Sequence, residues 1–443
     1  MMVVVGGGPA GRIAAMRLAE EGQEVCLVDS GGLGGQCLHF GCMVVCALND
    51  VARHRRQAET LAGLGIVDTV PGVSFGTLLK EMASIQATIH GILREETKQA
   101  GVTVLAEREA RVDGRTVTAG RETFRPEAVL VATGSAPYVP EIEGIGLPGI
   151  YTPHTLHTMP DLPETVAILG GGVMAAEFAY IFGGLGSRVE MICRSGFLPN
   201  IDPKLRETAR KDIAFATIRE NTAVDEFRGT GKVQTAELRS GDGREEIDVD
   251  AVFVAAGLVP RTEAVSGLEK GPLGEIRVDA SMRTSVSGVW AAGDVTGPPY
   301  LTPVARREGL VAAESMLGRE RTIDRAWIPQ SMSLGYDYAF SSMPAEPDVS
   351  ISIPAPAGPG TFWSVPARHT GMAKIRFQPD GGGITGIYAA APGASLSATY
   401  LAFLMRQGAT IHDFRDLLEV HPSTDGIYWL LQHSADWVRR HRP

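Results

Sequence analysis

Short apolar runs alternate with amphipathic stretches along the first 320 residues, and this order predicts strands and helices in turn. A β-branched run over Met2–Val5 predicts a strand, the apolar spacing over Arg12–Glu21 predicts a helix, and Glu24–Val28 predicts a second strand. A similar order begins at Val166–Ala175 and continues into a strand at Arg188–Ile192. Strands that alternate with helices are typical of parallel sheets, so the expected fold class is α/β.

The remaining elements fall into two regions, divided at about Glu320, where the composition changes. Before it we expect helices from Cys42, over Ser74–Gln99 and over Thr302–Leu317, and strands over Val102–Leu105, Arg111–Val117, Ala128–Gly134, Ala251–Gly257 and Thr284–Asp294. After it we expect a Pro-rich loop over Met343–Gly360, strands over Ala373–Phe377 and Ile384–Ala389, and helices over Ser395–Gln407 and His412–Leu418.

A glycine-rich turn joins the first strand to the first helix. Gly6, Gly8 and Gly11 form a G-x-G-x-x-G, and Asp29 ends the next strand. Such glycines let the backbone approach a pyrophosphate at a helix N-terminus, and the acid would accept hydrogen bonds from a ribose. The alternative is a purely structural turn. The complete order of strand, turn, helix, strand and acid favours a Rossmann-like dinucleotide-binding unit.

A second glycine-rich turn contains Gly170, Gly172 and Ala175, and alanine is allowed at the third small position. The following strand ends in Cys193 and Arg194 rather than in an acid. An acid would hold the free 2′-hydroxyl of NAD, whereas Arg194 suits a 2′-phosphate, so we expect NADPH rather than NADH. The alternative for Arg194 is a solvated surface charge. Two such units imply two nucleotides, FAD that stays bound and NADP (or NAD) that exchanges.

Three later strands end in small turns that complete the expected nucleotide sites. These turns contain Thr133 and Gly134, Gly257, and Gly293 and Asp294. Asp294 is expected to bind the sugar-like side chain of a flavin, and the helix after it is expected to point its N-terminus at the ring. The alternative for Asp294 is a helix cap.

The stretch Gly34–Cys46 reads GGQCLHFGCMVVC. On one continuous helix Cys37 and Cys42 would lie about 140° apart and about 7.5 Å apart along the axis, beyond the roughly 7 Å between Cα atoms that a disulfide spans. A bridge therefore needs a break before a helix starts, and Gly41 permits one. The hypothesis is a redox-active disulfide; the alternative is two buried structural thiols.

The composition of the chain argues against several classes of partner and of protein. Of the 443 residues, 44% are hydrophobic and 21% are charged, which is ordinary for a globular protein of two to four domains. A net charge of −10 argues against a nucleic-acid partner. No apolar run has membrane-spanning length and no signal region precedes the first strand, so a cytoplasmic location without a membrane partner is expected. An odd cysteine count with three crowded in ten residues indicates catalysis or metal binding, not a secreted disulfide framework; no metal site is assigned.

Taken together, these motifs resemble the pyridine nucleotide-disulfide oxidoreductases, such as dihydrolipoamide dehydrogenase, glutathione reductase and mercuric reductase. The two glycine turns, the C-x4-C, the later A-T-G and G-D turns and the terminal His421–Pro422 follow in the same order over nearly the whole chain. The resemblance implies two Rossmann-like domains and an α+β dimerisation domain. The expected domain bounds are residues 1–148 and 263–322 for the FAD-binding domain, 149–262 for the NAD(P)-binding domain, and 323–443 for the dimerisation domain.

The resemblance also implies roles for individual residues. NADPH at the second glycine turn would pass hydride to FAD, which would reduce a Cys37–Cys42 disulfide. Cys42 would be the charge-transfer thiolate and Cys37 would attack the substrate disulfide. His421 of the partner subunit in a homodimer would act as acid and base. A lone histidine is more often structural, so this last role depends on the resemblance.

Three features depart from the family pattern. Cys46 stands where the family has a Lys that pairs with a Glu, so Glu177 is expected to be protonated or otherwise paired. Cys46 itself is expected to be a small buried hydrophobe rather than a third redox thiol. Gly426 replaces a Glu that orients the histidine; either Asp425 takes its place or the histidine is a weaker base. Because no cysteine follows Cys193, mercuric reductase activity is not expected.

The expected function is NADPH-driven reduction of a small or protein-bound disulfide by a homodimeric FAD enzyme. One alternative is the oxidation of a lipoyl carrier with NAD, as in dihydrolipoamide dehydrogenase. A second is a diverged thiol enzyme that cleaves a thioether. A third is a flavin-binding protein without catalysis, whose flavin NADPH would bleach slowly or not at all.

Overall fold

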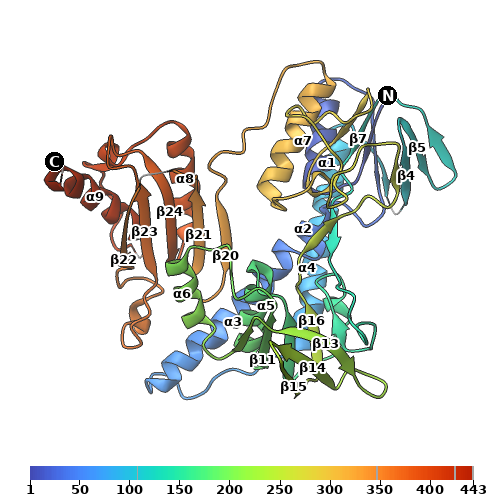
Figure 1. The fold of residues 1–443 in the computed structure, drawn as a ribbon. Helices are drawn as coiled ribbons and strands as arrows, with labels where there is room; N and C mark the ends of the chain where they lie inside the picture. Colours follow the sequence, from blue (N-terminus) through green and yellow to red (C-terminus); the bar gives the residue numbers. More distant parts are fainter. Residues whose placement is uncertain (107, 346–347, 424–425, 442–443) are drawn as a thin grey trace.

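A computed structural model describes residues 1–443 except residues 107, 346–347, 424–425 and 442–443. Asp425, the expected partner of the histidine, therefore lies outside the described residues. Two α/β units lie one above the other, and a C-terminal α+β unit lies beside them at the end of a long connection from α7 to β20 (Figure 1). The expected fold class is confirmed, with two parallel Rossmann-like sheets and a third, antiparallel sheet.

The first unit is built on a parallel five-stranded sheet in the order β19-β7-β1-β2-β3. Its strands are β1 (Met2–Val5), β2 (Val25–Asp29), β3 (Thr103–Ala106), β7 (Ala128–Val131) and β19 (Val289–Ala291). Every residue of β1, β2 and β7 is buried, as expected of parallel strands with both faces covered. The accompanying helices are α1 (Pro9–Glu20), α2 (Gly35–His39), α3 (Cys42–Gly63), α4 (Phe75–Gln99) and α7 (Thr302–Met316).

A small four-stranded sheet borders this unit and corrects one expected element. It contains β4 (Ala110–Asp113), β5 (Thr116–Ala119), β6 (Glu122–Phe124) and β18 (Val265–Ser266). The single strand expected over Arg111–Val117 is wrong, because Gly114 adopts a φ of 53° and turns the chain into a hairpin.

The second unit repeats the parallel design in the order β12-β11-β10-β16-β9. Its strands are β9 (Ile150–Tyr151), β10 (Thr165–Leu169), β11 (Arg188–Cys193), β12 (Thr217–Glu220) and β16 (Ala251–Val254), with helices α5 (Val173–Leu185) and α6 (Pro203–Asp212). An unexpected antiparallel sheet, β13 (Ala223–Arg228), β14 (Thr235–Ser240) and β15 (Gly243–Asp248), joins it. The pair β8 (Ser135–Pro137) and β17 (Leu258–Pro260) joins the chain after β7 to the chain after β16.

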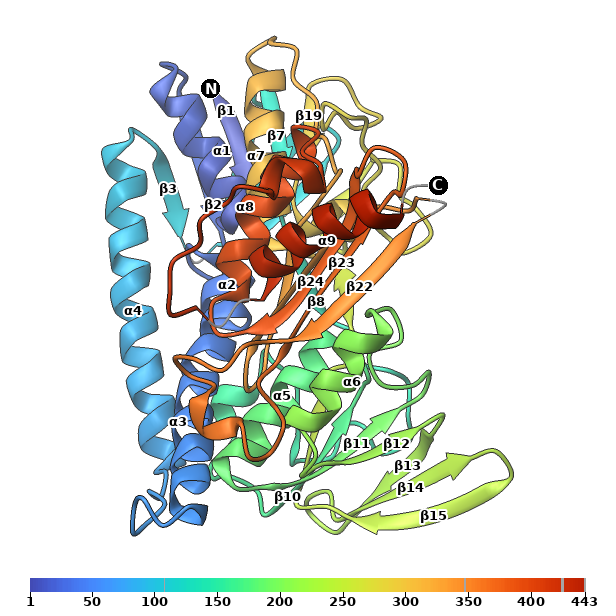
Figure 2. The same ribbon diagram turned by 90° about the vertical axis from the view of Figure 1, so that its left-hand side faces the viewer.

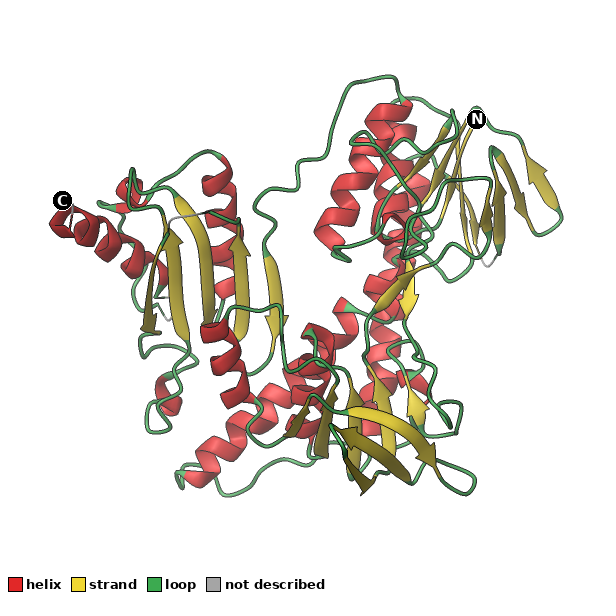
Figure 3. Ribbon diagram, in the orientation of Figure 1, coloured by secondary structure: helices red, strands yellow, loops and turns green. Residues whose placement is uncertain are grey.

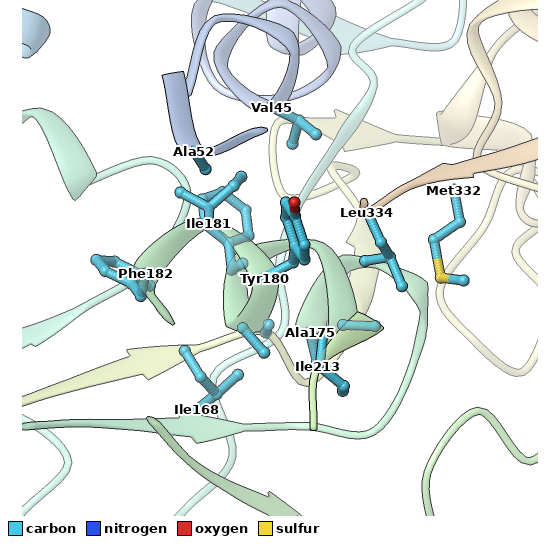
Figure 4. Packing of buried hydrophobic residues seen from close by; sticks show 14 of the residues in the cluster. Val45, Ala52, Ile168, Ala175, Tyr180, Ile181, Phe182, Ile213, Met332 and Leu334 are labelled. Carbon is cyan, nitrogen blue, oxygen red and sulfur yellow. The ribbon is translucent and has the colours of Figure 1, made fainter. Parts of the chain in front are cut away.

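Helix α5 lies at the centre of the largest hydrophobic core. Val45 and Ala52 of α3 lie on one side of it, and Met332 and Leu334, in and just after β20, lie on another (Figure 4). A Cβ on Gly184 of α5 would lie only 2.8 Å from the Cβ of Ala52, so the two helices touch through small residues. Each large side chain buried here stabilises the fold by roughly 1.5–3 kcal/mol. This core joins all three units.

The C-terminal unit is an antiparallel sheet in the order β20-β21-β24-β23-β22. The strands are β20 (Gln330–Ser333), β21 (Asp337–Ser342), β22 (Val349–Pro354), β23 (Met372–Phe377) and β24 (Ile384–Ala391). Helices α8 (Ala394–Arg406) and α9 (Ile427–His441) cover one face (Figure 2), and the change from parallel α/β units to this sheet is clear in Figure 3. Among the described helices, none is both long and apolar enough to cross a bilayer.

Two expectations for this unit are wrong, and strands β20 and β21 were not expected. The loop expected over Met343–Gly360 contains β22, whose alternation of Val349, Ile351 and Ile353 with serines is a strand pattern. The helix expected over His412–Leu418 is a single 3-10 turn, Ile411–Phe414. Helix α9 was not expected at all.

Candidate active site

A cavity of about 1700 Å³ runs between the first two units and reaches β20. This volume exceeds the roughly 300–1,000 Å³ of a usual small-ligand pocket. Of the predicted site residues, the cavity wall contains Gly6, Gly8, Asp29, Cys37, Cys42, Thr133, Gly134, Gly170, Gly172, Glu177, Arg194, Gly257, Gly293 and Asp294. Residues as far apart in the sequence as Gly6 and Asp294 are thus brought to one space large enough for two nucleotides.

The predicted site residues that do not line the cavity are Gly11, Ala175 and His421. A Cβ on Gly11 would lie 1.9 Å from the carbonyl oxygen of Gly6, so Gly11 permits close packing of α1 on the turn. Ala175 is fully buried. His421 is exposed on the C-terminal unit, so within one chain the structure does not bring it to the cysteines.

The first glycine turn fits a dinucleotide pyrophosphate. Gly6 has a φ of 107°, and a Cβ there would lie 2.1 Å from the carbonyl oxygen of Ala132. Gly8, the N-cap residue of α1, has only the Cα of Gly35 near its Cβ direction, at 3.9 Å, and it opens on the cavity. No side chain caps α1, so its first N–H groups are available to an anionic ligand.

The two predicted acidic ligands have local partners as well. Asp29 accepts hydrogen bonds from the N–H of Gly7 and, at 3.0 Å, of Gly31, and a carboxylate retains capacity for ribose hydroxyls beyond these. Asp294 accepts from the Ser135 hydroxyl at 2.6 Å, and burial raises its pKa. Asp294 caps no helix, because the N-cap residues of the neighbouring 3-10 turn (Asp294–Thr296) and of α7 are Gly293 and Leu301.

In the second glycine turn, as in the first, one glycine packs closely against the backbone and another faces open space. Gly170 has a φ of 145°, and a Cβ there would lie 2.3 Å from the carbonyl oxygen of Ala255, whereas nothing lies within 4 Å of a Cβ on Gly172. The buried thiol of Cys193 donates to the carbonyl oxygen of Gly170 at 3.4 Å, and burial raises its pKa to about 12. Cys193 therefore stabilises the turn. Arg194 is exposed at the cavity wall.

The cysteine pair lies where two helices meet. Helix α2 ends at His39 and α3 begins at Cys42, so the required break between Cys37 and Cys42 is present. Both are thiols; Cys42 is exposed at the cavity wall and Cys37 is half-buried, so the alternative of two buried structural thiols is wrong. The Sγ of Cys42 lies 3.7 Å from the Oγ1 of Thr302, the first residue of α7.

The thiols of Cys37 and Cys42 influence each other's pKa when the pair is reduced. A hydrogen bond from the Cys42 thiol, with smaller contributions from Thr302 and the charge of Arg306, lowers the pKa of Cys37 to about 6. Donating that bond, together with burial, raises the pKa of Cys42 above the ordinary thiol range. The two sulfurs thus share one proton, so the reduced pair carries one negative charge and supplies the thiolate, which is the reactive form.

Glu177 and Cys46 stand where the family pattern has a Glu–Lys ion pair, so Glu177 lacks the lysine partner. Glu177 accepts a hydrogen bond from the N–H of Ser333 at 2.9 Å, and burial raises its pKa to about 8. It is therefore protonated at neutral pH, as expected. The expectation that Cys46 is a buried hydrophobe is wrong: one turn after Cys42 it lies on the same face of α3, exposed at the cavity wall.

The carboxyl of Glu177 predicts a pH dependence of stability. Its folded pKa of about 8 lies above the ordinary 4.5, so the folded protein keeps a proton that the unfolded chain releases. Stability is then greatest below the unfolded pKa and falls as pH rises toward 8, by at most about 1.4 kcal/mol per pH unit. Between pH 5.5 and 7.5 the free energy of unfolding should fall by roughly 1–3 kcal/mol more in the wild type than in Glu177→Gln. Equal slopes in chemical denaturation would show that Glu177 is ionised in the folded protein.

Several site residues could not be found from the sequence. Thr302 touches the cysteines and Ser333 holds Glu177, yet each is distant from its partner in the chain. The amide oxygen of Gln36 pairs with the ring of His154 at 3.1 Å, and Phe40 packs on that ring with 4.3 Å between centroids. No motif marks these residues; only the position of Thr302 at a predicted helix start gave a signal.

Residues 1–309 match the family model described as pyridine nucleotide-disulphide oxidoreductase. The chain belongs to this family. A glutathione reductase of Burkholderia cepacia is 32% identical over 328 residues, which cover 72% of this chain and 71% of the relative. A mercuric reductase of Shigella flexneri is 27% identical over 94% of this chain and 77% of its own length. A dihydrolipoyl dehydrogenase of Thermus scotoductus is 28% identical over 95% and 94%, respectively.

Solved structures agree on the fold. The HOCl-induced flavoprotein disulfide reductase RclA from Escherichia coli superposes with a TM-score of 0.85 at 21% identity, over the full length of both chains. As a pyridine nucleotide-disulphide oxidoreductase, the protein is an FAD-dependent enzyme that uses NAD(P)H and acts on sulfur groups. The glycine turns and the open space at Gly8 and Gly172 fit such nucleotides.

Proposed function

We propose that the protein is a homodimeric reductase that passes electrons from NADPH through FAD and the Cys37–Cys42 disulfide to a small or protein-bound disulfide. The observation that carries this proposal is the contact between the two thiols at the wall of a cavity that both glycine turns share. The residues named above for FAD and NADP are proposed to bind these nucleotides. Mercuric ion is not proposed as a substrate, although relatives bear that name, because no cysteine follows Cys193.

The sulfur chemistry follows from the two thiols. FAD, when bound, supplies the transfer of the hydride electron pair from the nicotinamide to the disulfide, which becomes one thiol and one thiolate. The Cys37 thiolate then attacks the substrate S–S bond, forms a mixed disulfide and releases one substrate thiolate. Cys42 loses its proton and attacks the Cys37 sulfur, so the enzyme disulfide re-forms and the second substrate thiol leaves. One NADPH and one proton thus convert one disulfide into two thiols.

We propose that the acid and base of this exchange is His421 of the partner subunit. Within one chain His421 lies exposed and away from the cavity, so only a second chain could supply it. Helix α8 supports such a dimer, because it leaves large apolar side chains in solvent: Leu396 is 69% exposed, Tyr400 69% and Phe403 60%. Apolar side chains gathered on one helix mark an interaction surface.

Arg194 is proposed to read the 2′-phosphate of NADPH. Arg194→Ala should raise the KM for NADPH by about tenfold or more, the equivalent of one lost charged contact of about 1.4 kcal/mol, and leave the KM for NADH nearly unchanged. Arg194→Lys, which keeps the charge but not the planar donor pair, should lie between the two. If the variants and the wild type show the same preference, another group selects the nicotinamide.

The decisive test of the function is an anaerobic stopped-flow comparison of NADPH and NADH as reductants of the purified flavoprotein, followed by turnover on a panel of disulfides. Rapid bleaching by NADPH with steady reduction of at least one disulfide is expected. Faster reaction with NADH together with oxidation of dihydrolipoamide would favour a lipoyl-carrier dehydrogenase instead. Slow bleaching by both nucleotides would contradict a catalytic role.

A further inference from the structure

Positive charge gathers beside the cysteine pair, on the same helix that touches it. Thr302, which contacts Cys42, is the first residue of α7, and Arg306 lies one helical turn further on the same face. Arg306 is exposed. Its charge reaches Cys37, because it is among the causes that lower the pKa of that thiol.

Further arginines extend this charge across the junction between α7 and α8. Burial and the charges of Arg321 and Arg406 lower the pKa of Arg307, and the carboxylate of Asp324 opposes them. Asp324 is itself bound to Arg406 at 2.5 Å. Within the part of the chain that the structure describes, no carboxylate oxygen lies within ion-pair distance of Arg306, Arg307 or Arg321.

This excess is unusual for the molecule as a whole. The chain carries a net charge of −10, and another pair of consecutive arginines, Arg55 and Arg56 of α3, is balanced because both bind Glu59. Leaving like charges together without counter-ions is unfavourable, so such a cluster marks a place where an anionic ligand compensates it. Here that place borders the sulfur that would attack the substrate.

We propose that Arg306, with Arg307 and Arg321 beyond it, selects disulfide substrates that carry negative charge, as carboxylate or phosphate, close to the S–S bond. This inference rests on the proposed function and specifies its substrate class. A positive field at a reactive thiolate concentrates anions and orients them, and such focusing changes association rates by about tenfold or more. The same field screens out cationic disulfides.

The field can be measured without turnover. Enzyme reduced by dithiothreitol and freed of excess reagent is alkylated with iodoacetate, an anion, or iodoacetamide, its neutral analogue, and modification of Cys37 is followed by peptide mass spectrometry. Both reagents attack the same thiolate, so the ratio of their rates does not depend on its pKa. Arg306→Glu should lower the iodoacetate-to-iodoacetamide ratio about tenfold. Arg306→Lys should keep the wild-type ratio.

A matched control and a substrate series complete the test. Arg94→Glu makes the same change of net charge at an exposed position of α4 away from the cavity, and should leave the ratio unchanged. Turnover is compared for three small disulfides of similar size: dithiodiglycolate (anionic), bis(2-hydroxyethyl) disulfide (neutral) and cystamine (cationic). We expect kcat/KM to be highest for the anionic disulfide, lower for the neutral one and lowest for the cationic one. Arg306→Glu should abolish these differences, whereas Arg94→Glu should preserve them.

The outcomes separate the two proposals. Turnover of the neutral disulfide with no preference for the anion, or an equal effect of Arg306→Glu and Arg94→Glu, would overturn the role of Arg306 and leave the reductase intact. Rapid flavin bleaching by NADPH with no turnover of any disulfide would overturn the proposed function and this inference with it.

Discussion

Cys42→Ser is expected to lower the rate of NADPH-dependent disulfide reduction by at least about 10³-fold, because the S–S bond that accepts the electron pair from the flavin can no longer form. Reduction of the bound flavin by NADPH should remain close to the wild-type rate, since neither glycine turn is altered. Stopped-flow absorbance separates the two steps. The long-wavelength thiolate–flavin band should also disappear; if it persists, the sulfur beside the flavin is not Cys42.

Cys46→Ser is the matched control for this experiment. Cys46 lies on the same helix and the same cavity wall one turn later, whereas it is the Sγ of Cys42 that lies 3.7 Å from Thr302. Partial burial of its otherwise exposed thiol, and the neighbouring thiol and carboxylate charges, raise the pKa of Cys46, which makes it a poor nucleophile. Its serine variant should therefore retain most of the turnover. A loss as large as that of Cys42→Ser would identify Cys46 as a third redox thiol.

Gly6→Ala is expected to destabilise the protein by about 3 kcal/mol or more, and to prevent isolation of a yellow protein. The methyl group would lie 2.1 Å from the carbonyl oxygen of Ala132, the residue that follows β7, and alanine would have to adopt a φ of 107°. Neither strain can be relieved by moving a flexible side chain. Chemical denaturation and the flavin absorbance after purification measure the effect.

Gly8→Ala separates folding from cofactor binding. Its methyl group would meet nothing closer than 3.9 Å in the protein and would project into the cavity. This variant should therefore unfold at nearly the wild-type denaturant concentration but bind FAD more weakly. If Gly6→Ala and Gly8→Ala are equally stable, the tight approach of the turn to Ala132 is not needed for folding.

The parts of the site that were predicted correctly are those encoded by neighbouring residues. The glycine turns at Gly6 and Gly170 and the helix break between Cys37 and Cys42 depend on local backbone conformation, which sequence spacing reports directly. The alternation in β22 was equally visible but was outweighed by nearby prolines. The expectation that Cys46 is buried was wrong, although the helical period that places it one turn after Cys42 could be read from the sequence.

What the sequence could not reveal depends on tertiary packing. The contact of Thr302 with Cys42 joins residues 260 positions apart, and the bond from Ser333 to Glu177 spans 156 positions. The position of His421 away from the cavity is likewise a property of the folded chain rather than of its motif.

The close contact of α3 and α5 through Ala52 and Gly184 has a mechanical consequence. Helix α3 starts at Cys42, one of the two proposed redox sulfurs, and α5 starts at the glycine turn proposed to bind the nicotinamide nucleotide. Dense interiors resist gradual deformation. The cysteine pair and the second glycine turn are therefore held at a fixed distance by two helices that pack as one rigid body. Arrival and departure of the exchanging nucleotide should then involve loops and side chains, with no hinge swing between the halves.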